Sequence, residues 1–401
     1  PDSAGAGGGA MILTPADAAW LHMEEPGNVM NINGVFVLDG PLEVGRLRRR
    51  LEERLLSFER FRCKVVHPVL GWPRWEVDPE FDLDRHLVVE SSTGDLMERV
   101  GELLSQPLDR AHPLWRMHAV DLGGRWALIA RLHHSMGDGV ALMHVLGRLA
   151  DRVPETYRTP HPPGRLAWLR SARELVSDVL LRPEPATALK GPLGTVKRAA
   201  VSRPIPLEAI KAMGRRAGCS VNDVLLSALA GSLREHVGEV EVRAVMPVDL
   251  RRAEDDRLGN RFGLIFVPLP VGMADPLARA REVHRRLERL KGSAQPLILF
   301  AILSLAGRLP VGVESLLVRI FGSRATAVVT NVPGPRQMLE IDGQPLRELM
   351  FWVPQSGRLG LGVSLISYAD TVRIGVAADA GLLPRPEDLV VGFHRALEEL
   401  A

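Results

Sequence analysis

The sequence HHSMGDG at residues 133–139 brings two imidazoles, a carboxylate and two glycines together within seven positions. It lies between a strand-like run at residues 125–132 and a helix-like run at residues 140–150. An imidazole with a pKa near ~6.5 is largely neutral at pH 7, so it can accept a proton from a substrate hydroxyl. The glycines allow the sharp turn and the close backbone approach that such a junction requires. This segment is therefore the first candidate for a chemical site.

Four interpretations of the segment compete. A metal site is disfavoured, because adjacent histidines on a strand point to opposite faces and no third ligand cluster accompanies them. A structural interpretation makes Asp138 the N-cap of the next helix and both histidines packed polar residues. A third pairs His133 with Asp138, as in membrane glycerolipid acyltransferases, although the chain lacks their Glu-Gly-Thr-Arg-type substrate motif. The fourth makes His134 a general base on a hydroxyl group. The spacing alone does not decide between the last two.

The composition is that of an ordinary globular protein, with 46% hydrophobic and 24% charged residues among 401. The 50 basic and 48 acidic side chains leave a formal charge of +2, which gives no indication of nucleic-acid binding. The apolar run at residues 297–307 is too short to cross a bilayer, which needs about 20 residues. Cys63 and Cys219 form no CxxC or zinc pattern and suit a reducing cytosol, although one disulfide is compatible with the sequence.

The chain is expected to contain two α/β domains joined by a connector. Residues 1–10 are predicted to be a flexible leader without the features of a signal peptide. The domains are expected at residues 11–153 and 207–401, with a proline-rich connector over 154–206. The connector contains one predicted amphipathic helix, at residues 166–181. We expect this helix to pack across both domains rather than to meet anionic lipid, because its three arginines are few for a membrane patch.

Local patterns predict the main elements. Thr14, Pro15 and Asp17 have the types expected at the cap, first position and first turn of a helix. Ser220 and Asp223 have the spacing of a capping box. In the first half, strands are predicted at 33–38, 115–121 and 125–132, and a helix at 42–56. In the second half, strands are predicted at 241–245, 264–269, 325–330, 360–367 and 372–376, and helices at 221–237, 276–291 and 296–306.

Other short elements occur in a fixed order around the histidine motif. They are LTPADAAW (13–20), FDLDRH (81–86), PLDR (107–110), PLW (113–115), ND (222–223), MPVDLR (246–251), GNRFG (259–263), TNVPGP (330–335) and SLISY (364–368). Each is weak alone, but their order and spacing together are specific. HHSMGDG itself resembles the HHxxxDG motif of the condensation-domain and chloramphenicol-acetyltransferase-like superfamily. From residue 13 to the C-terminus, the chain resembles the bacterial wax ester synthase/diacylglycerol acyltransferase family.

The resemblance implies an α/β fold of two chloramphenicol-acetyltransferase-like domains, with mixed sheets flanked by helices and a tunnel between them. It implies transfer of a long-chain acyl group from acyl-CoA to a fatty alcohol or a diacylglycerol, giving a wax ester or triacylglycerol, with no cofactor. The implied partners are long-chain acyl-CoA, the acceptor alcohol and a peripheral membrane or lipid-droplet surface, and the implied location is cytoplasmic and peripherally membrane-associated. Two alternatives remain: an acyltransferase acting on another alcohol or amine, and a non-catalytic lipid-binding relative.

Carried onto this chain, the resemblance makes His134 the general base of the reaction. His133, Asp138 and Gly139 belong to the same catalytic motif, with His133 expected to support the loop from the other face. The tetrahedral oxyanion needs hydrogen-bond donors. Backbone N–H groups from Gly137 to Gly139 and the amide of Asn260 are the candidates, so Gly137 and Asn260 are predicted to contact the substrate.

Asp138 is expected to act structurally, by capping the next helix or by pairing with an arginine and so keeping His134 aimed. Arg131 and Arg251 are equally compatible with that pairing. Residues 330–335 are expected to cross near the tunnel, because Pro-Gly-Pro fixes an irregular path. Residues 259–271 are expected to form either a wall of a lipid channel or an ordinary buried strand.

Overall fold

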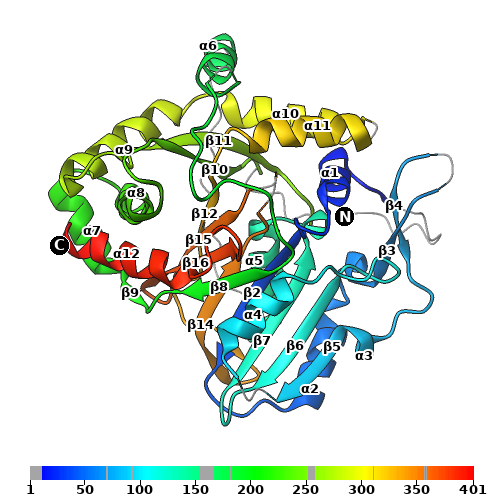
Figure 1. Ribbon diagram of the computed structural model, residues 1–401. Coiled ribbons are helices and arrows are strands. Elements are labelled where there is room, and N and C mark those ends of the chain that lie inside the picture. Colours follow the sequence, from blue (N-terminus) through cyan, green and yellow to red (C-terminus); the bar gives the residue numbers. More distant parts are fainter. Residues whose placement is uncertain are drawn as a thin grey trace.

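The computed structural model describes residues 11–68, 71–91, 94–152, 167–180, 182–251, 258–309, 311–355, 357 and 359–401. Within these ranges, two mixed β-sheets lie side by side and are covered by helices (Figure 1). A small three-stranded sheet stands beside the first of them and consists of β1 (Met11–Ile12), β4 (Arg74–Val77) and β3 (Cys63–Val66). The expected mixed α/β fold class is confirmed.

The first sheet carries the histidine motif at the end of one of its central strands. Strands β6 (Trp115–Asp121) and β7 (Trp126–His133) form a hairpin, whose turn contains Gly123 and Gly124 at φ of 76° and 105°, a region that favours glycine. All described pairs in this sheet are antiparallel except β5 (Leu87–Ser91) with β6. The order across the sheet is β13 (Glu340–Ile341), β14 (Gln344–Trp352), β2 (Asn31–Leu38), β7 (Trp126–His133), β6 (Trp115–Asp121) and β5 (Leu87–Ser91).

The second sheet forms the other wall of the molecule. Strand β12 (Ala327–Pro333) runs parallel to both of its neighbours, while the outer pairs are antiparallel. The order is β11 (Phe262–Leu269), β10 (Val242–Asp249), β12 (Ala327–Pro333), β15 (Leu361–Tyr368), β16 (Thr371–Asp379) and β8 (Lys197–Val201), with β9 (Ile205–Pro206) also paired to β16.

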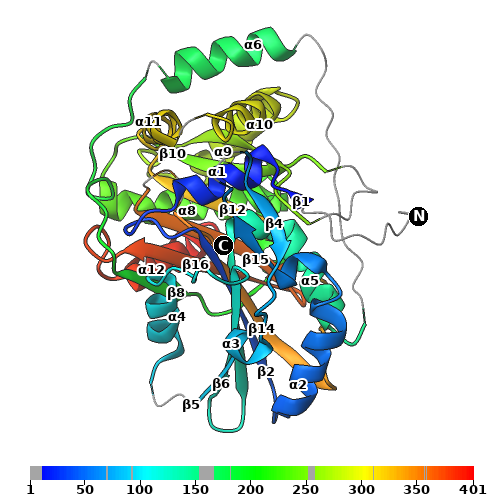
Figure 2. The same ribbon diagram turned by 90° about the vertical axis from the view of Figure 1, so that its right-hand side faces the viewer.

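Helices cover both faces of each sheet. Figure 2 shows the first sheet between α4 (Leu96–Leu104) on one side and α2 (Val44–Arg50) and α5 (Gly139–Leu149) on the other. One face of the second sheet packs against α7 (Leu207–Ala217), α8 (Val221–Val237), α9 (Pro276–Leu290) and α12 (Pro386–Glu398). The opposite face packs against α10 (Gln295–Ala306), which is followed by α11 (Val311–Gly322). Among the described residues, no helix is both long enough and apolar enough to cross a membrane.

The two sheets do not follow the domain boundaries predicted from the sequence. Strands β13 and β14 come from the second half of the chain but complete the first sheet beside β2. Strands β8 and β9 belong to the expected connector, yet they pair with β16 in the second sheet. An exposed strand edge leaves backbone N–H and C=O groups without partners. The strands that cross from the other part of the chain hydrogen-bond to these groups, which explains why they join the sheet there. Residues 154–166 and 181 of the connector, and the leader, lie outside the described residues.

Most local predictions are confirmed to within a few residues. Thr14 caps α1 (Pro15–Met23) by accepting a hydrogen bond from the backbone N–H of Asp17, and Ser220 and Asp223 form the predicted capping box. The helix predicted at 42–56 is α2 continued by a π-helical turn, Leu51–Leu55. The connector helix is α6 (Ala167–Glu174), continued by a second such turn, Leu175–Leu180. It packs against the start of α10, where the Ser171 hydroxyl accepts a 2.8 Å hydrogen bond from the Ala294 N–H.

Candidate active site

The two histidines of the motif lie at the point where β7 ends. The strand stops at His133, a 3-10 turn spans His134–Met136, and α5 begins at Gly139. The His134 N–H donates to the Met30 carbonyl at 2.7 Å, which fixes the turn against the loop that precedes β2. His133 faces Glu24, with Nε2 3.1 Å from its carboxylate, whereas the His134 ring stacks on Trp20. The expected divergence of the two imidazoles is therefore confirmed.

Hydrogen bonds determine which nitrogen of His134 is free. The Nδ2 group of Asn260 donates to Asp17 Oδ1 at 2.8 Å and to the His134 carbonyl at 2.7 Å. With both amide hydrogens used, the Asn260 Oδ1 faces His134 Nδ1 at 2.9 Å as an acceptor. His134 Nδ1 therefore carries the ring proton and Nε2 presents a lone pair, which is the tautomer that a general base needs.

The surroundings of His134 favour the neutral imidazole. Its side chain is 7% exposed. Its ring lies 3.9 Å from that of Trp20 between centroids, at an interplanar angle of 14°, and Phe262 stands 5.7 Å away. Burial lowers the pKa of His134 to about 4, even though the charge of Asp138 opposes this shift. At neutral pH the ring is a neutral acceptor.

Asp17 completes the hydrogen-bonded chain behind His134. It is fully buried, and its Oδ1 also accepts from the Asn260 backbone N–H at 3.1 Å. Burial raises the pKa of Asp17, while Arg60, 3.6 Å away, opposes that shift. Arg60 in turn donates to the Met136 carbonyl at 3.0 Å. From its sequence context Asp17 is expected only as a charge in the first turn of a helix, and its position behind His134 is a finding of the structure.

Asn260 lies beside His134 but in a different position from the one predicted. We expected its amide to donate to a substrate oxyanion, yet both amide hydrogens are donated inside the protein. Its observed contacts suit orientation of the imidazole instead. The link from His134 through Asn260 to Asp17 has the logic of a catalytic triad, in which a third group holds the base in one tautomer.

His133 supports the same loop from the opposite side. Its Nδ1 accepts from the Ser135 backbone N–H at 3.1 Å and from the Ser135 hydroxyl at 2.8 Å. Burial alone would raise the pKa of Glu24, but its contacts with His133 and with the Met30 N–H hold that pKa below its ordinary value. The geometry agrees with the expected supporting position of His133.

Asp138 joins the motif to the second half of the chain. Its carboxylate caps α5 by accepting from the Ala141 N–H at 3.1 Å, accepts from the Arg261 N–H at 3.0 Å and lies 2.7 Å from Arg251 Nη1. Arg251 also donates to the Gly259 carbonyl at 2.6 Å. The predicted cap and the predicted ion pair are thus both present.

Of the two arginines considered as the partner of Asp138, the structure places Arg251 there. Arg131 instead donates to the Gln106 carbonyl. The difference follows from strand geometry, because Arg131 shares the face of β7 with His133, whereas Asp138 lies beyond the strand, after the turn.

We expect Asp138→Ala to destabilise the fold more than any other change in this ion-pair cluster. It would leave the guanidinium of Arg251, whose side chain is 3% exposed, without its shortest ion pair. Breaking a buried pair in this way costs roughly 3–5 kcal/mol of unfolding free energy. Urea unfolding followed by circular dichroism measures this loss. Asp249→Ala is the matched control, because Asp249 is 28% exposed and 3.3 Å from Arg251, and it should cost about 1 kcal/mol. A loss for Asp138→Ala no larger than that of the control would contradict the assignment.

A cleft of about 490 Å³ opens between the two sheets beside His134. The expectation that residues 330–335 cross near the tunnel is confirmed, since all six line this cleft. Phe262, Leu264 and Ile265 line it as well, so part of the segment 259–271 forms a channel wall. Asn222 and Asn331 meet across it through a 3.0 Å hydrogen bond between their side chains.

The start of α5 offers hydrogen-bond donors to the cleft. Gly139 and Val140 line it and occupy the first two helical positions, where backbone N–H groups have no intrahelical acceptor. Gly137 is not among the residues that line the cleft, and its contact with substrate stays a prediction. Its N–H instead closes the turn on the His134 carbonyl at 3.3 Å, and a Cβ at this position would crowd Ala141 at 3.1 Å.

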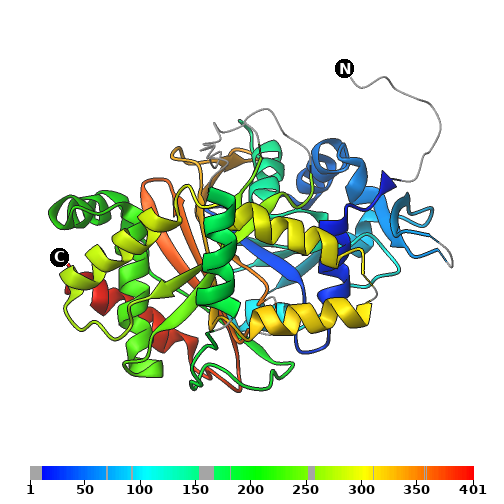
Figure 3. The same cartoon turned by 90° about the horizontal axis from the view of Figure 1, so that it is seen from above.

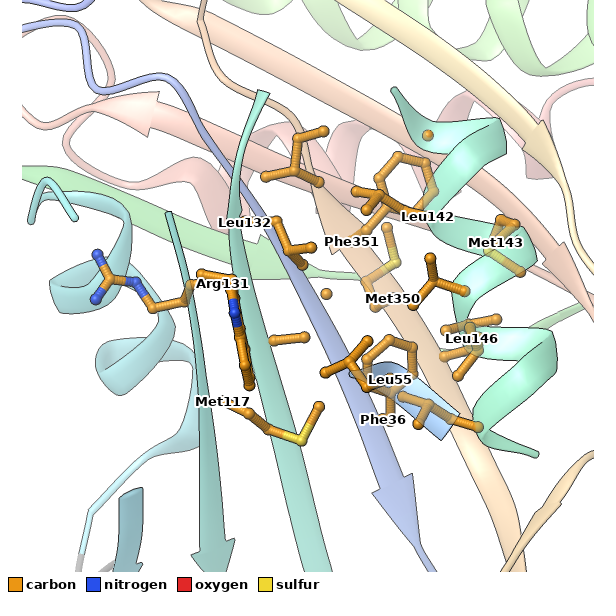
Figure 4. A pocket seen from close by; sticks show the side chains of 18 of the residues that line it. Phe36, Leu55, Met117, Arg131, Leu132, Leu142, Met143, Leu146, Met350 and Phe351 are labelled. Atoms are coloured by element: carbon orange, nitrogen blue, oxygen red, sulfur yellow. The ribbon is translucent and has the colours of Figure 1, made fainter. Parts of the chain in front are cut away.

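An apolar cavity extends from the cleft between α5 and the first sheet (Figure 4). Among its labelled lining residues, Phe36, Leu146 and Met350 face one another across it, whereas the guanidinium of Arg131 points away. The cavity and the cleft share five lining residues, which are Ile32, Gly139, Met143, Val332 and Phe351. The two spaces are therefore adjoining parts of one site.

Comparison with known proteins places the chain in a family. Residues 13–182 match the wax ester synthase/diacylglycerol acyltransferase catalytic domain, and residues 258–401 match the WS/DGAT C-terminal domain. The chain is 29% identical to a Mycobacterium bovis protein named as a diacylglycerol O-acyltransferase and to Tgs1 of Mycobacterium tuberculosis, named likewise. Each alignment covers 97% of this chain and 95% of the relative.

Solved structures show the same fold at lower sequence identity. The wax ester synthase/diacylglycerol acyltransferase from Marinobacter aquaeolei VT8 superposes with a TM-score of 0.75 at 23% identity, covering 97% of this chain and 98% of that one. A starter condensation domain of rhizomide synthetase, solved as a mutant in complex with C8-CoA and Leu-SNAC, gives 0.63 at 15% identity, covering 97% and 93%.

Two mixed sheets with a histidine motif on the cleft between them define the class of two-domain, chloramphenicol-acetyltransferase-like proteins. Within that class, this chain belongs to the wax ester synthase/diacylglycerol acyltransferase family, and it is an acyltransferase.

Proposed function

We propose that the protein transfers a long-chain acyl group from acyl-CoA to the hydroxyl of a fatty alcohol or a diacylglycerol, with His134 as the general base. The observation that carries this proposal is the environment of His134. Its Nδ1 is held by Asn260, its pKa is about 4, and its ring lines the cleft between the sheets. A neutral imidazole in a fixed tautomer, in a cleft with apolar walls, suits deprotonation of a lipid alcohol.

The proposed reaction needs no covalent enzyme intermediate. Nε2 takes the hydroxyl proton as the oxygen attacks the thioester carbonyl, and the N–H groups of Gly139 and Val140 stabilise the oxyanion that forms. When the tetrahedral intermediate collapses, the C–S bond breaks and the imidazolium returns the proton to the CoA thiolate. Asn260 favours the transient imidazolium because it accepts the Nδ1–H, and the carboxylate of Asp17 behind it supplies a buried negative charge.

The apolar cavity under α5 is proposed to hold one alkyl chain. Aliphatic and aromatic side chains surround it, and it adjoins the cleft at Gly139, next to the reacting groups. Acyl-CoA as donor is supported by the fold relative solved with C8-CoA. The names of the relatives support a diacylglycerol acceptor, and the Marinobacter structure supports a wax-forming alcohol as well.

The reaction can be tested by following thiol release from palmitoyl-CoA with hexadecanol, with diolein or with no acceptor. We expect release that depends on the acceptor, together with the matching wax ester or triacylglycerol in the lipid extract. Release with an amine or another alcohol only would favour the second candidate, a different acyl acceptor. Lipid that copurifies without any thioester turnover would favour a lipid-binding protein and overturn the proposal.

The depressed pKa of His134 predicts an unusual pH profile. A base is active when deprotonated, so kcat/KM should stay on its plateau down to about pH 5 and decline as the pH approaches about 4. An ordinary histidine would lose activity near pH 6.5. Initial rates of thiol release in overlapping buffers measure the profile. Circular dichroism at each pH identifies the range in which the protein is folded. An acid limb near 6.5 in folded protein would contradict a buried, neutral His134.

A further inference from the structure

A polar pocket of about 550 Å³ lies on the first sheet, outside the catalytic cleft. Its wall contains Arg85, Arg116 and Arg131, and among the described residues it shares no lining residue with the cleft. It adjoins the apolar cavity under α5, but the guanidinium of Arg131 points away from that cavity (Figure 4). Figure 3 shows the N-terminal part of the chain, in blue, at the right and α12, in red, at the left, and the pocket belongs to the half of the molecule that contains the first sheet. A pocket of this size suits a small molecule.

Two of these arginines face each other across neighbouring strands. Arg116 of β6 and Arg131 of β7 are direct partners in the antiparallel pair, so both side chains lie on the same face of the sheet. Like charges in directly opposite positions destabilise a sheet. Burial and the charge of Arg116 lower the pKa of Arg131 to about 10, which still leaves it charged at neutral pH. The pair therefore opposes folding unless an anion lies beside the two guanidinium groups.

The protein supplies acceptors for only some of the N–H groups of this pair. Arg131 is 2% exposed and donates through Nη2 to the Gln106 carbonyl, while its Nε–H has no acceptor among the described residues. Arg116 donates through Nε to the Arg85 carbonyl at 3.1 Å, and its terminal nitrogens have no hydrogen-bond partner in the described part of the chain. Within the same residues, no carboxylate forms an ion pair with either arginine. A buried donor without an acceptor is costly, so these free N–H groups point to a ligand.

The remaining charges at the pocket leave an excess of positive charge. Its two carboxylates, Asp84 and Asp109, are exposed, and Asp84 pairs with Arg48, which lies outside the pocket. Arg85 is oriented by His112, whose Nε2 accepts from its Nη1 at 2.8 Å. Arginine binds phosphate oxygens through two parallel N–H···O bonds. A phosphate group also carries more charge and more acceptor oxygens than a carboxylate, so it suits a cluster of arginines better.

We propose that this pocket binds the phosphate group of a small molecule, with Arg116 and Arg131 as its main contacts. The anion would compensate the two like charges and accept hydrogen bonds from N–H groups that the protein leaves without acceptors. The pocket is large enough for the rest of a phosphorylated molecule as well. Acyl-CoA and a separate phosphorylated molecule both carry such a group, and enzyme kinetics can distinguish these two sources. Binding of phosphate at this site does not depend on the proposed acyl transfer.

Isothermal titration calorimetry of the full chain with inorganic phosphate tests the site. We expect saturable binding of phosphate, and binding of acetate that is at least about tenfold weaker. Arg116→Gln should bind phosphate at least about tenfold more weakly than the wild type, because it loses charge-assisted hydrogen bonds. Arg125→Gln is the matched control, since it removes the same charge from the turn of the same hairpin, at a side chain that is 55% exposed and outside the pocket. The control should bind phosphate like the wild type.

The melting temperature separates binding from packing. In phosphate-free buffer, Arg116→Gln should melt no lower than the wild type, because the like-charge pair is gone. Phosphate should raise the Tm of the wild type and of Arg125→Gln, and it should leave the Tm of Arg116→Gln nearly unchanged. If Arg116 had only a structural role, the variant would melt at a lower temperature without phosphate, and phosphate would not shift the Tm of the wild type.

Several results would overturn the inference. These are a wild type that does not bind phosphate, acetate that binds as tightly as phosphate, an Arg116→Gln variant with the affinity of the wild type, and equal losses in Arg116→Gln and Arg125→Gln.

The source of the phosphate follows from KM for palmitoyl-CoA once phosphate binding is established. A KM that rises in Arg116→Gln but not in Arg125→Gln would assign the phosphate to the acyl donor. A KM equal to that of the wild type would assign it to a separate phosphorylated molecule. If no acceptor supports thiol release, the acyl-CoA proposal fails while the phosphate site stands, because calorimetry does not depend on turnover.

Discussion

Replacing His134 with alanine is expected to lower kcat for acyl transfer by about 10²–10⁴-fold, the usual contribution of a positioned general base. The variant removes the one ring nitrogen that is proposed to take the substrate proton. The rest of the cleft and its donors at Gly139 and Val140 are retained. Acceptor-dependent thiol release with palmitoyl-CoA and diolein measures the effect. Because acyl-CoA binding does not require the base, KM for palmitoyl-CoA should change little.

The neighbouring histidine provides the comparison that separates chemistry from packing. His133 is also buried, but its contacts are with Glu24 and Ser135 rather than with the cleft. We expect His133→Ala to lower the unfolding free energy by about 1–3 kcal/mol, because it leaves buried polar groups without their partner, and to retain more activity than His134→Ala. Equal activity in His134→Ala and the wild type would remove His134 as the base.

The parts of the site that lie within one contiguous segment could be predicted from the sequence. The HHSMGDG segment sets a strand end, a turn and a helix start next to each other, so the divergence of His133 from His134 and the capping by Asp138 follow from local geometry alone. The choice of Arg251 over Arg131 required the tertiary structure, because both arginines are compatible with an ion pair until the strand face is known.

The residues behind His134 could not be recognised locally. An aspartate three positions after a Thr cap has a sufficient explanation as a first-turn charge, so nothing in the pattern indicated that Asp17 accepts from Asn260 across 243 positions of sequence. The one available signal was that LTPADAAW and GNRFG both belong to the ordered series of family elements. Strand β14 was also not predicted from the sequence. Its pairing with β2, which lies in the other half of the chain, is visible only in the tertiary structure.

The contacts of Asn260 predict the second large effect. Asn260→Ala removes the acceptor of the His134 Nδ1–H, so the imidazole can place its proton on Nε2 and lose its basic nitrogen. In a serine protease, loss of the corresponding acceptor costs about 10⁴-fold in kcat. We expect a smaller loss here, about 10–100-fold, because Asn260 is uncharged and the Trp20 stack still holds the ring. Steady-state kinetics should show the loss in kcat, with nearly unchanged KM for palmitoyl-CoA.

Asp17→Asn isolates the contribution of charge from that of orientation. The new amide oxygen can still accept from both N–H groups of Asn260, so the tautomer is retained while the negative charge behind it is lost. We expect kcat to decrease in the order wild type, Asp17→Asn, Asn260→Ala, His134→Ala. A structural role alone would lower the unfolding free energy without producing this order. If folded Asn260→Ala and Asp17→Asn both had the kcat of the wild type, the chain from His134 to Asp17 would not take part in proton transfer.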